Sequence, residues 1–170
     1  MEEDVEFADA LTAINNCRSK KAHLSGLGEA AVSAGQPLSV LLVDVDNFKA
    51  INDTWGHAAG DTILRELAAR FRRNTRAVDT ACRLGGEEFV ILMPGSSLAD
   101  ACQIGERVRH SIAAELFHIN RDSKIAVTAS VGIASLEGAQ DSVERLLARA
   151  DAALYAAKKD GRNRVVADAA

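Results

Sequence analysis

The sequence has few aromatic residues and few cysteines. Aromatic residues make up 4% of the 170 positions, so a buried core has to be built mainly from Leu, Ile, Val and Ala. The three cysteines, Cys17, Cys82 and Cys102, are odd in number, and none belongs to a Cys-x-x-Cys pair. This spacing indicates neither a zinc site nor a disulfide framework, and it fits a reducing cytoplasm.

The chain also lacks an excess of positive charge and a long apolar run. Its 20 basic and 24 acidic residues give a net charge of −4, which argues against a nucleic-acid partner but allows a local phosphate site. The acidic start, Met1 to Asp4, lacks the basic flank of a signal peptide. The longest aliphatic run, Val40 to Val43, is too short to span a bilayer. We therefore expect a cytoplasmic protein without direct membrane insertion.

What remains is a globular composition, with 48% hydrophobic and 26% charged residues. Apolar spacing predicts helices at about 3–14, 18–34, 47–55, 59–73, 98–112 and 143–160, strands at 38–46, 124–135 and 164–166, and a hairpin at 79–93. Ser97 with Asp100, and Asp141 with Glu144, have the spacing of helix capping boxes. This order predicts one α/β (α+β) domain at 15–170, preceded by a linker helix at 1–14 from an upstream domain.

The predicted hairpin contains two glycines followed by two acids. Gly85 and Gly86 favour a tight turn and allow another molecule to approach the backbone closely. Glu87 and Glu88 follow directly. The pattern fits an ordinary acidic surface hairpin, and it also fits a rim that holds a divalent cation beside a phosphate.

A second acidic pair ends the most apolar strand. Asp44 and Asp46 lie on one face of that strand, because side chains alternate, and Val45 lies on the other. Such acids serve as turn or cap residues, or as ligands of Mg²⁺ together with substrate phosphates. A partner carboxylate from the hairpin would favour the metal, but the sequence does not establish that the two segments are adjacent.

Three further segments carry polar groups with two interpretations each. Asn52 and Asp61 fit turn and cap chemistry, and they also fit recognition of a guanine edge. Basic residues from Lys158 to Arg164 complement a helix C-terminus, and they also suit a triphosphate. Arg76 and Asp79 form either a local ion pair or a site for guanine.

Taken together, these motifs resemble the GGDEF family of diguanylate cyclases over roughly residues 9–166. The matching segments are Asp9-x-Leu11-Thr12, Val43 to Lys49, Ile51-Asn52-Asp53, Gly56-His57, Gly60-Asp61, Gly85 to Phe89 (the GGEEF form), Ala150 to Lys158 and Gly161-Arg162-Asn163. The resemblance implies a ferredoxin-like sandwich, similar to the palm of nucleotidyl cyclases and polymerases. Its central sheet would be mainly antiparallel and flanked by helices, and a β-hairpin would carry the signature loop.

The resemblance also implies the reaction and its partners. Members of the family condense two GTP into cyclic di-GMP with release of pyrophosphate. One domain holds one GTP, so catalysis implies a homodimer. Cyclic di-GMP is expected to inhibit through an RxxD site made of Arg76 and Asp79, with Arg107 as an extension. An upstream sensor or receiver domain is a further expected partner.

Residue roles follow from the matched motifs. Asp44, Glu87 and the backbone carbonyl of Val45 would hold Mg²⁺ or Mn²⁺, and Glu88 would assist deprotonation of the ribose 3′-hydroxyl. Asn52 and Asp61 would read guanine. The remaining expected GTP contacts are Phe48, Gly85, Gly86, Lys158 and Arg162, with Lys49 nearby as a catalytic lysine.

Two departures from the family pattern are visible. Ala13-Ile14-Asn15-Asn16-Cys17-Arg18 replaces the usual Gly-Leu-x-Asn-Arg-Arg, which is expected to alter linker geometry rather than chemistry. Leu84 replaces an aromatic residue before the glycines. Two other readings stay open: a non-catalytic receptor for GTP or cyclic di-GMP, and a cyclase that acts on one nucleotide.

Overall fold

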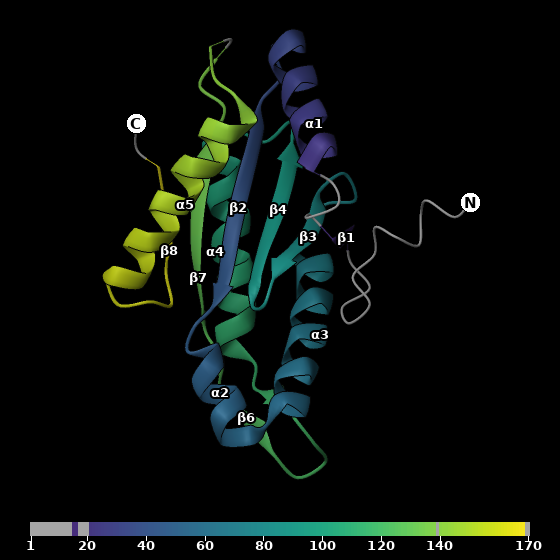
Figure 1. Cartoon of the computed structure of the whole chain (residues 1–170), viewed down its shortest axis with the longest axis vertical. Coiled ribbons are helices and arrows are strands. Elements are labelled where there is room, and N and C mark those ends of the chain that lie inside the picture. The colour runs from purple at the N-terminus through teal and green to yellow at the C-terminus, as the bar shows by residue number, and fades with distance from the viewer. Residues whose placement is uncertain (1–14, 17–20, 139, 169–170) are drawn as a thin grey trace, which may run out of the picture.

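The computed structural model describes residues 15–16, 21–138 and 140–168, so the expected helix at 3–14 lies outside the described residues. A six-stranded sheet runs through the domain in the order β1-β3-β4-β2-β7-β8 (Figure 1). Its strands are β1 (Asn15–Asn16), β2 (Leu38–Val45), β3 (Thr80–Gly85), β4 (Glu88–Pro94), β7 (Ala129–Ser135) and β8 (Val165–Ala167). A separate two-stranded sheet contains β5 (Phe117–His118) and β6 (Lys124–Ile125).

The central sheet is mainly antiparallel, as predicted. β2 pairs antiparallel with both β4 and β7, and β3 pairs antiparallel with β4. Only the outer pairs, β1 with β3 and β7 with β8, are parallel among the described strands. The inner order β3-β4-β2-β7, with helical connections from β2 to β3 and from β4 to β7, is the predicted ferredoxin-like arrangement.

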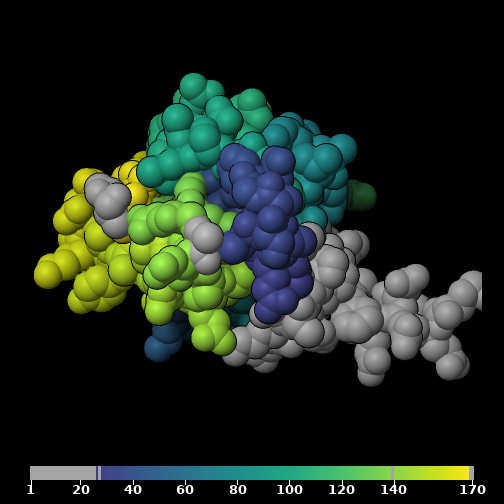
Figure 2. All heavy atoms as spheres, turned by 90° about the horizontal axis from the view of Figure 1, so that it is seen from above, coloured from purple at the N-terminus to yellow at the C-terminus, as the bar shows by residue number. Residues whose placement is uncertain are grey.

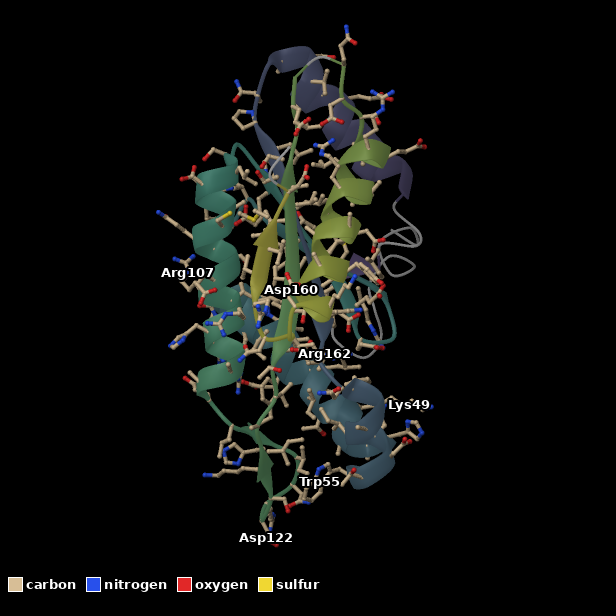
Figure 3. All side chains as sticks on the ribbon, turned by 90° about the vertical axis from the view of Figure 1, so that its left-hand side faces the viewer. Lys49, Trp55, Arg107, Asp122, Asp160 and Arg162 are labelled. Carbon is tan, nitrogen blue, oxygen red and sulfur yellow. The ribbon has the colours of Figure 1, made fainter. Side chains whose placement is uncertain are left out.

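Helices cover both faces of the sheet. They are α1 (Lys21–Ala34), α2 (Phe48–Trp55), α3 (His57–Asn74), α4 (Leu98–Ala114) and α5 (Val143–Lys159). One core cluster joins the sheet to α3 and α4, and a second joins it to α5, with α1 packed against that second cluster. Figure 3 shows α4 and α5 on opposite sides of the sheet. None of the helices in the described ranges combines the length and apolarity needed to cross a bilayer.

β2 is the central strand because its residues are apolar on both faces. All eight of its residues are buried. Leu41 and Val43 contribute to the cluster with α3 and α4, whereas Val40 and Leu42 contribute to the cluster with α5. This double burial places the carboxyl end of β2, with its acidic pair, between two helical layers.

The strand predicted at 124–135 is wrong as a single element. β6 ends at Ile125 and belongs to the small sheet, whereas β7 begins at Ala129. Between them, the Thr128 carbonyl accepts a hydrogen bond from the backbone N–H of Asp46 at 2.9 Å, beyond the end of β2. Tertiary contacts thus divide a segment that has uniform β propensity.

Helix capping was predicted correctly at one end and wrongly at another. The Ser97 side chain accepts a hydrogen bond from the backbone N–H of Asp100 at the start of α4. At α5, however, the cap is Ser142, which accepts from the backbone N–H of Arg145. Asp141 instead forms an ion pair with Arg149 at 2.7 Å, a long-range contact that competes with capping.

Candidate active site

The hairpin turn and the end of β2 are adjacent. In the β2–β4 ladder Asp44 lies opposite Glu88, and the backbone N–H of Val45 donates to the Glu87 carbonyl at 3.3 Å. Gly86 adopts a positive φ of 51° in the turn, which favours glycine. The sheet register therefore supplies the adjacency that the sequence did not establish.

A small pocket opens where these elements meet. Its volume is about 180 Å³, and it is lined by Asp44, Val45, Asp46, Asn47, Phe48, Lys49, Glu87, Lys158 and Arg162. Lys158 and Arg162 come from the end of α5 and the turn after it, and Lys49 comes from the first turn of α2 (Figure 3). Seven of these residues were expected site residues, and they come from segments more than 100 positions apart in the chain.

The Asp44 carboxylate is the electrostatic centre of this pocket. It is buried and forms an ion pair with the Lys158 ammonium group. Burial raises the pKa of Asp44 to about 6, against the lowering effect of Lys158, and the charges of Glu87 and Glu88 raise it further. Burial alone would lower the pKa of Lys158, but its hydrogen bond and charge interaction with Asp44 make the net shift upward.

The donor set fits a hard divalent cation. Asp44 and Glu87 offer carboxylates and Val45 borders the same pocket, and Glu87 is close enough to Asp44 to raise its pKa. No cluster of three or more His, Cys, Asp or Glu side chains suited to a metal was found among the described residues. The two carboxylates suit a divalent cation whose remaining ligands are substrate phosphates and water rather than further protein side chains.

The expected guanine residues lie on the neighbouring helices. Asn52 is on α2, and its side-chain Oδ1 is buried without a hydrogen-bond partner. Asp61 is exposed in the second turn of α3. Gly60 provides the space beside Asn52, because a Cβ there would lie 1.9 Å from Asn52 Oδ1 and 3.1 Å from the Phe48 ring. An unpaired buried amide oxygen is suited to accept a hydrogen bond from a ligand N–H.

The expected product-binding residues lie elsewhere. The Arg76 guanidinium donates to Asp79 Oδ1 at 2.8 Å and to the carbonyl of Pro94 at 2.9 Å. Pro94 ends β4, whereas Glu88 begins it beside the pocket, so the two regions are separated by one strand, roughly 20 Å. Arg107 donates to the Asn74 carbonyl at 2.6 Å, which brings it to the same end of α3 as Arg76.

Three residues that support the pocket were not predicted. Thr128 and Ser130 donate to the Asp46 carboxylate at 2.7 Å each. Arg109 donates to the Asn163 side chain at 2.8 Å. These pairs are separated by 82, 84 and 54 positions, and no local pattern signals them.

Several hollows among the described residues are larger than this pocket, and two of them exceed about 500 Å³. One, of about 550 Å³, lies between α1, the start of α4 and the segment after β7 (Figure 2). The other, of about 620 Å³, lies between α3 and the segment around β5 and β6. Neither is lined by any of the expected site residues, so volume alone does not identify the functional pocket.

Comparison with known proteins gives a consistent result. The family model described as "Diguanylate cyclase, GGDEF domain" matches residues 6–164. The response regulator PleD of Caulobacter vibrioides is 45% identical over 168 residues, which is 98% of this chain and 37% of that protein. Diguanylate cyclase DosC of Escherichia coli is 45% identical over 131 residues, or 77% of this chain and 28% of that protein. The chain thus spans about a third of the length of these relatives.

Solved structures show the same fold. The GGDEF domain of DgcB from Caulobacter crescentus, in complex with c-di-GMP, superposes with a TM-score of 0.91 at 32% identity, covering 96% of each chain. The active GGEEF domain of a diguanylate cyclase from Vibrio cholerae gives a TM-score of 0.85 at 32% identity, covering 92% of this chain and 98% of that one.

Proposed function

The chain belongs to the GGDEF family, and from this premise we propose that it is a diguanylate cyclase that condenses two GTP molecules into cyclic di-GMP and releases two pyrophosphates. The observation that carries the proposal is the pocket itself. A buried carboxylate, Asp44, meets a second acid, Glu87, and two cations, Lys158 and Arg162, in one small hollow. This combination suits a metal-bound triphosphate.

Each group has a task in this reaction. Asp44, Glu87 and the Val45 carbonyl would hold Mg²⁺ or Mn²⁺, and the bound metal would stabilise charge on the reacting phosphate oxygens. Lys158 and Arg162 bind the terminal phosphates. Lys49 is exposed at the pocket rim, where it adds positive charge near the leaving pyrophosphate.

The guanine base and the attacking ribose involve the neighbouring residues. The unpaired Asn52 Oδ1 accepts an N–H of guanine, and Asp61 accepts another. Phe48 lines the pocket next to these residues. Gly85 and Gly86 let the phosphates lie against the hairpin. Glu88 is exposed opposite Asp44, so it is placed to assist loss of the 3′-hydroxyl proton from a second GTP.

In the proposed reaction the domain works with a second copy of itself and is inhibited by its product. Two domains face each other with twofold symmetry so that each GTP attacks the other, and cyclic di-GMP inhibits through Arg76, Asp79 and Arg107. An upstream sensor or receiver domain, connected through residues 1–14, sets the approach of the two domains.

The test is direct. The purified chain, fused to a dimerising leucine zipper, is incubated with GTP and Mg²⁺, and nucleotides are separated and weighed by mass spectrometry. We expect cyclic di-GMP and pyrophosphate from the wild type and a loss of at least about 100-fold in rate for Asp44→Asn, because the substitution removes a metal ligand. Tight cyclic di-GMP or GTP binding without turnover would instead indicate a receptor, and a product made from one nucleotide would indicate a different cyclase.

A further inference from the structure

The turn after α5 presents Arg162 in an unusual backbone conformation. Arg162 and Asn163 have φ values of 63° and 45°, so two successive residues with side chains occupy the left-handed region. Such a conformation is costly for L-amino acids and persists only where surrounding contacts hold it. The turn follows Lys158 directly, and Arg162 and Lys158 both line the active-site pocket.

The contact that holds this turn from the sheet is Asp46. Its Oδ2 accepts from the backbone N–H of Asn163 at 2.9 Å and from the Thr128 hydroxyl at 2.7 Å, while Oδ1 accepts from the Ser130 hydroxyl at 2.7 Å. The residue is only 6% exposed. From the other side, Arg109 donates to the Asn163 side chain at 2.8 Å. The turn is therefore held between Asp46, just after the end of β2, and Arg109 on α4.

We propose that Asp46 is a positioning residue that aims Arg162 at the terminal phosphates of GTP, and that it is not a metal ligand. Both of its oxygens already accept hydrogen bonds from the protein, whereas the Asp44 carboxylate pairs with the ammonium group of Lys158. The inference rests on the proposed function for the role of Arg162. It separates the two acids at the end of β2, which the sequence presents as an equivalent pair.

The chemistry of the clamp predicts which substitutions are tolerated. In Asp46→Asn, the amide oxygen still accepts from Asn163 and Thr128, while the amide NH₂ faces Ser130, whose hydroxyl can rotate to accept. In Asp46→Ala, the Asn163 N–H loses its acceptor and the turn is released. A metal ligand would show a different pattern, because loss of the negative charge would impair both variants.

The experiment measures equilibrium binding of a non-cleavable α,β-methylene GTP analogue and of GMP, in Mg²⁺, by calorimetry. For Asp46→Ala we expect affinity for the analogue to fall about 10-fold while GMP affinity stays within about twofold, since only the terminal-phosphate contact is lost. Asp46→Asn should stay within about twofold for both. If Asp46→Ala cannot be purified, Asp46→Ser, whose hydroxyl is too short to reach the Asn163 N–H, replaces it.

Two controls separate positioning from general stability. In an Arg162→Ala background, Asp46→Ala should cause no further loss of analogue affinity, because the residue acts through Arg162. Asp141→Ala removes another ion-paired carboxylate, whose side chain is 4% exposed, and should lower thermal stability without changing the analogue-to-GMP ratio. An additive loss in the Arg162→Ala background, or equal damage from Asp46→Asn, would overturn the inference. A wild-type chain that does not prefer the analogue over GMP would refute the phosphate site of the proposed function itself.

Discussion

At the scale of single residues, Asp44 has been placed where an ionised carboxylate is costly. It is 5% exposed, and burial outweighs the pairing with Lys158, so its pKa rises to about 6. A group whose folded pKa lies above its unfolded value of 3.8 destabilises the fold when ionised. This destabilisation is absent well below pH 4, grows as pH rises from about 4 to about 6, and is constant at higher pH. The folded chain thus sacrifices stability to keep a carboxylate in the pocket.

The first prediction tests this cost. In EDTA at pH 7.5, Asp44→Asn should be more stable than the wild type by about 2 kcal/mol, because the buried charge is removed. The difference should shrink as pH falls through 6 towards 4, where wild-type Asp44 binds a proton. Thermal unfolding of both proteins across this pH range is the measurement. Equal melting temperatures at pH 7.5 would show that Lys158 compensates the charge fully.

Asp141 gives a matched control of opposite sign. Its hydrogen bond with Arg149, opposed by burial and aided by the backbone N–H groups of Glu137 and Ser142, lowers its pKa to about 2. Its stabilising contribution is therefore present above pH 4 and is lost as pH falls through 2. Asp141→Asn should be less stable than the wild type at pH 7.5, the reverse of Asp44→Asn.

At the scale of elements, the contact between α5 and β7 sets the position of Lys158. Gly132 in β7 lies under the helix, where an added Cβ would come within 2.3 Å of the Ala150 carbonyl oxygen and of the Leu154 backbone nitrogen. These are backbone atoms, so no side-chain rotation relieves the clash. The absence of a side chain at one position lets the helix pack closely enough for Lys158 to reach Asp44.

The second prediction follows from this packing. Gly132→Ala should push α5 away from the sheet, destabilise the fold by about 3 kcal/mol and weaken nucleotide binding by displacing Lys158. Gly26→Ala is the control, since nothing lies within 4 Å of the added Cβ and the position is within α1, where alanine is favoured over glycine. Chemical denaturation measures the free energy of unfolding of both variants. A Gly132→Ala variant as stable as Gly26→Ala would show that the helix can shift freely.

The turn between α3 and β3 carries the third prediction. Arg76→Ala should raise the inhibition constant for cyclic di-GMP at least about 10-fold, because it removes a guanidinium that can donate two hydrogen bonds to one guanine, at O6 and N7. The Michaelis constant for GTP should not change, since β4 separates this turn from the pocket. Arg73→Ala, an exposed arginine paired with Glu66 on the same helix, should leave inhibition intact. An unchanged inhibition constant in Arg76→Ala would refute the site.

Local patterns predicted the elements whose burial is regular. β2 is apolar on both faces and α3 has a complete apolar stripe, so both were placed within about two residues. β1 and β5, of two residues each, were not predicted, because so short a segment carries no periodicity. The cap predicted at Asp141 was wrong for a different reason, since the helix begins one residue later with Ser142 as its cap, and the Asp141 carboxylate pairs with Arg149 eight positions away.

The candidate site was foreseen as a set of residues but not as a geometry. Asp44 and Lys158 were each named from motifs, yet 114 positions separate them and only the fold brings them into contact. The different roles that we propose for Asp44 and Asp46 could not be predicted from the sequence either. It depends on Thr128 and Ser130, whose hydroxyls are placed by the register of β7 against β2.

At the scale of the whole molecule, the pocket is small for the reaction we propose. A volume of about 180 Å³ is below the range usual for a drug-sized ligand, and the exposed Glu88 lies at its edge. Under the function we propose, a second GTP would come from another copy of the domain that faces the hairpin and completes the site.

The last prediction concerns this completion. If two domains are required, the rate per mole of protein should rise in proportion to protein concentration while the chain is mainly monomeric, and level off as dimers form. Fusion to a leucine zipper should abolish the dependence and hold the rate at the plateau, because the effective concentration of the second domain becomes high at any dilution. Sedimentation velocity run at the same concentrations reports the dimer fraction, and the zipper fusion of Asp44→Asn is the inactive control. A rate per mole that stays constant while sedimentation shows only monomers would mean that one domain binds both GTP molecules, and the twofold arrangement would have to be abandoned.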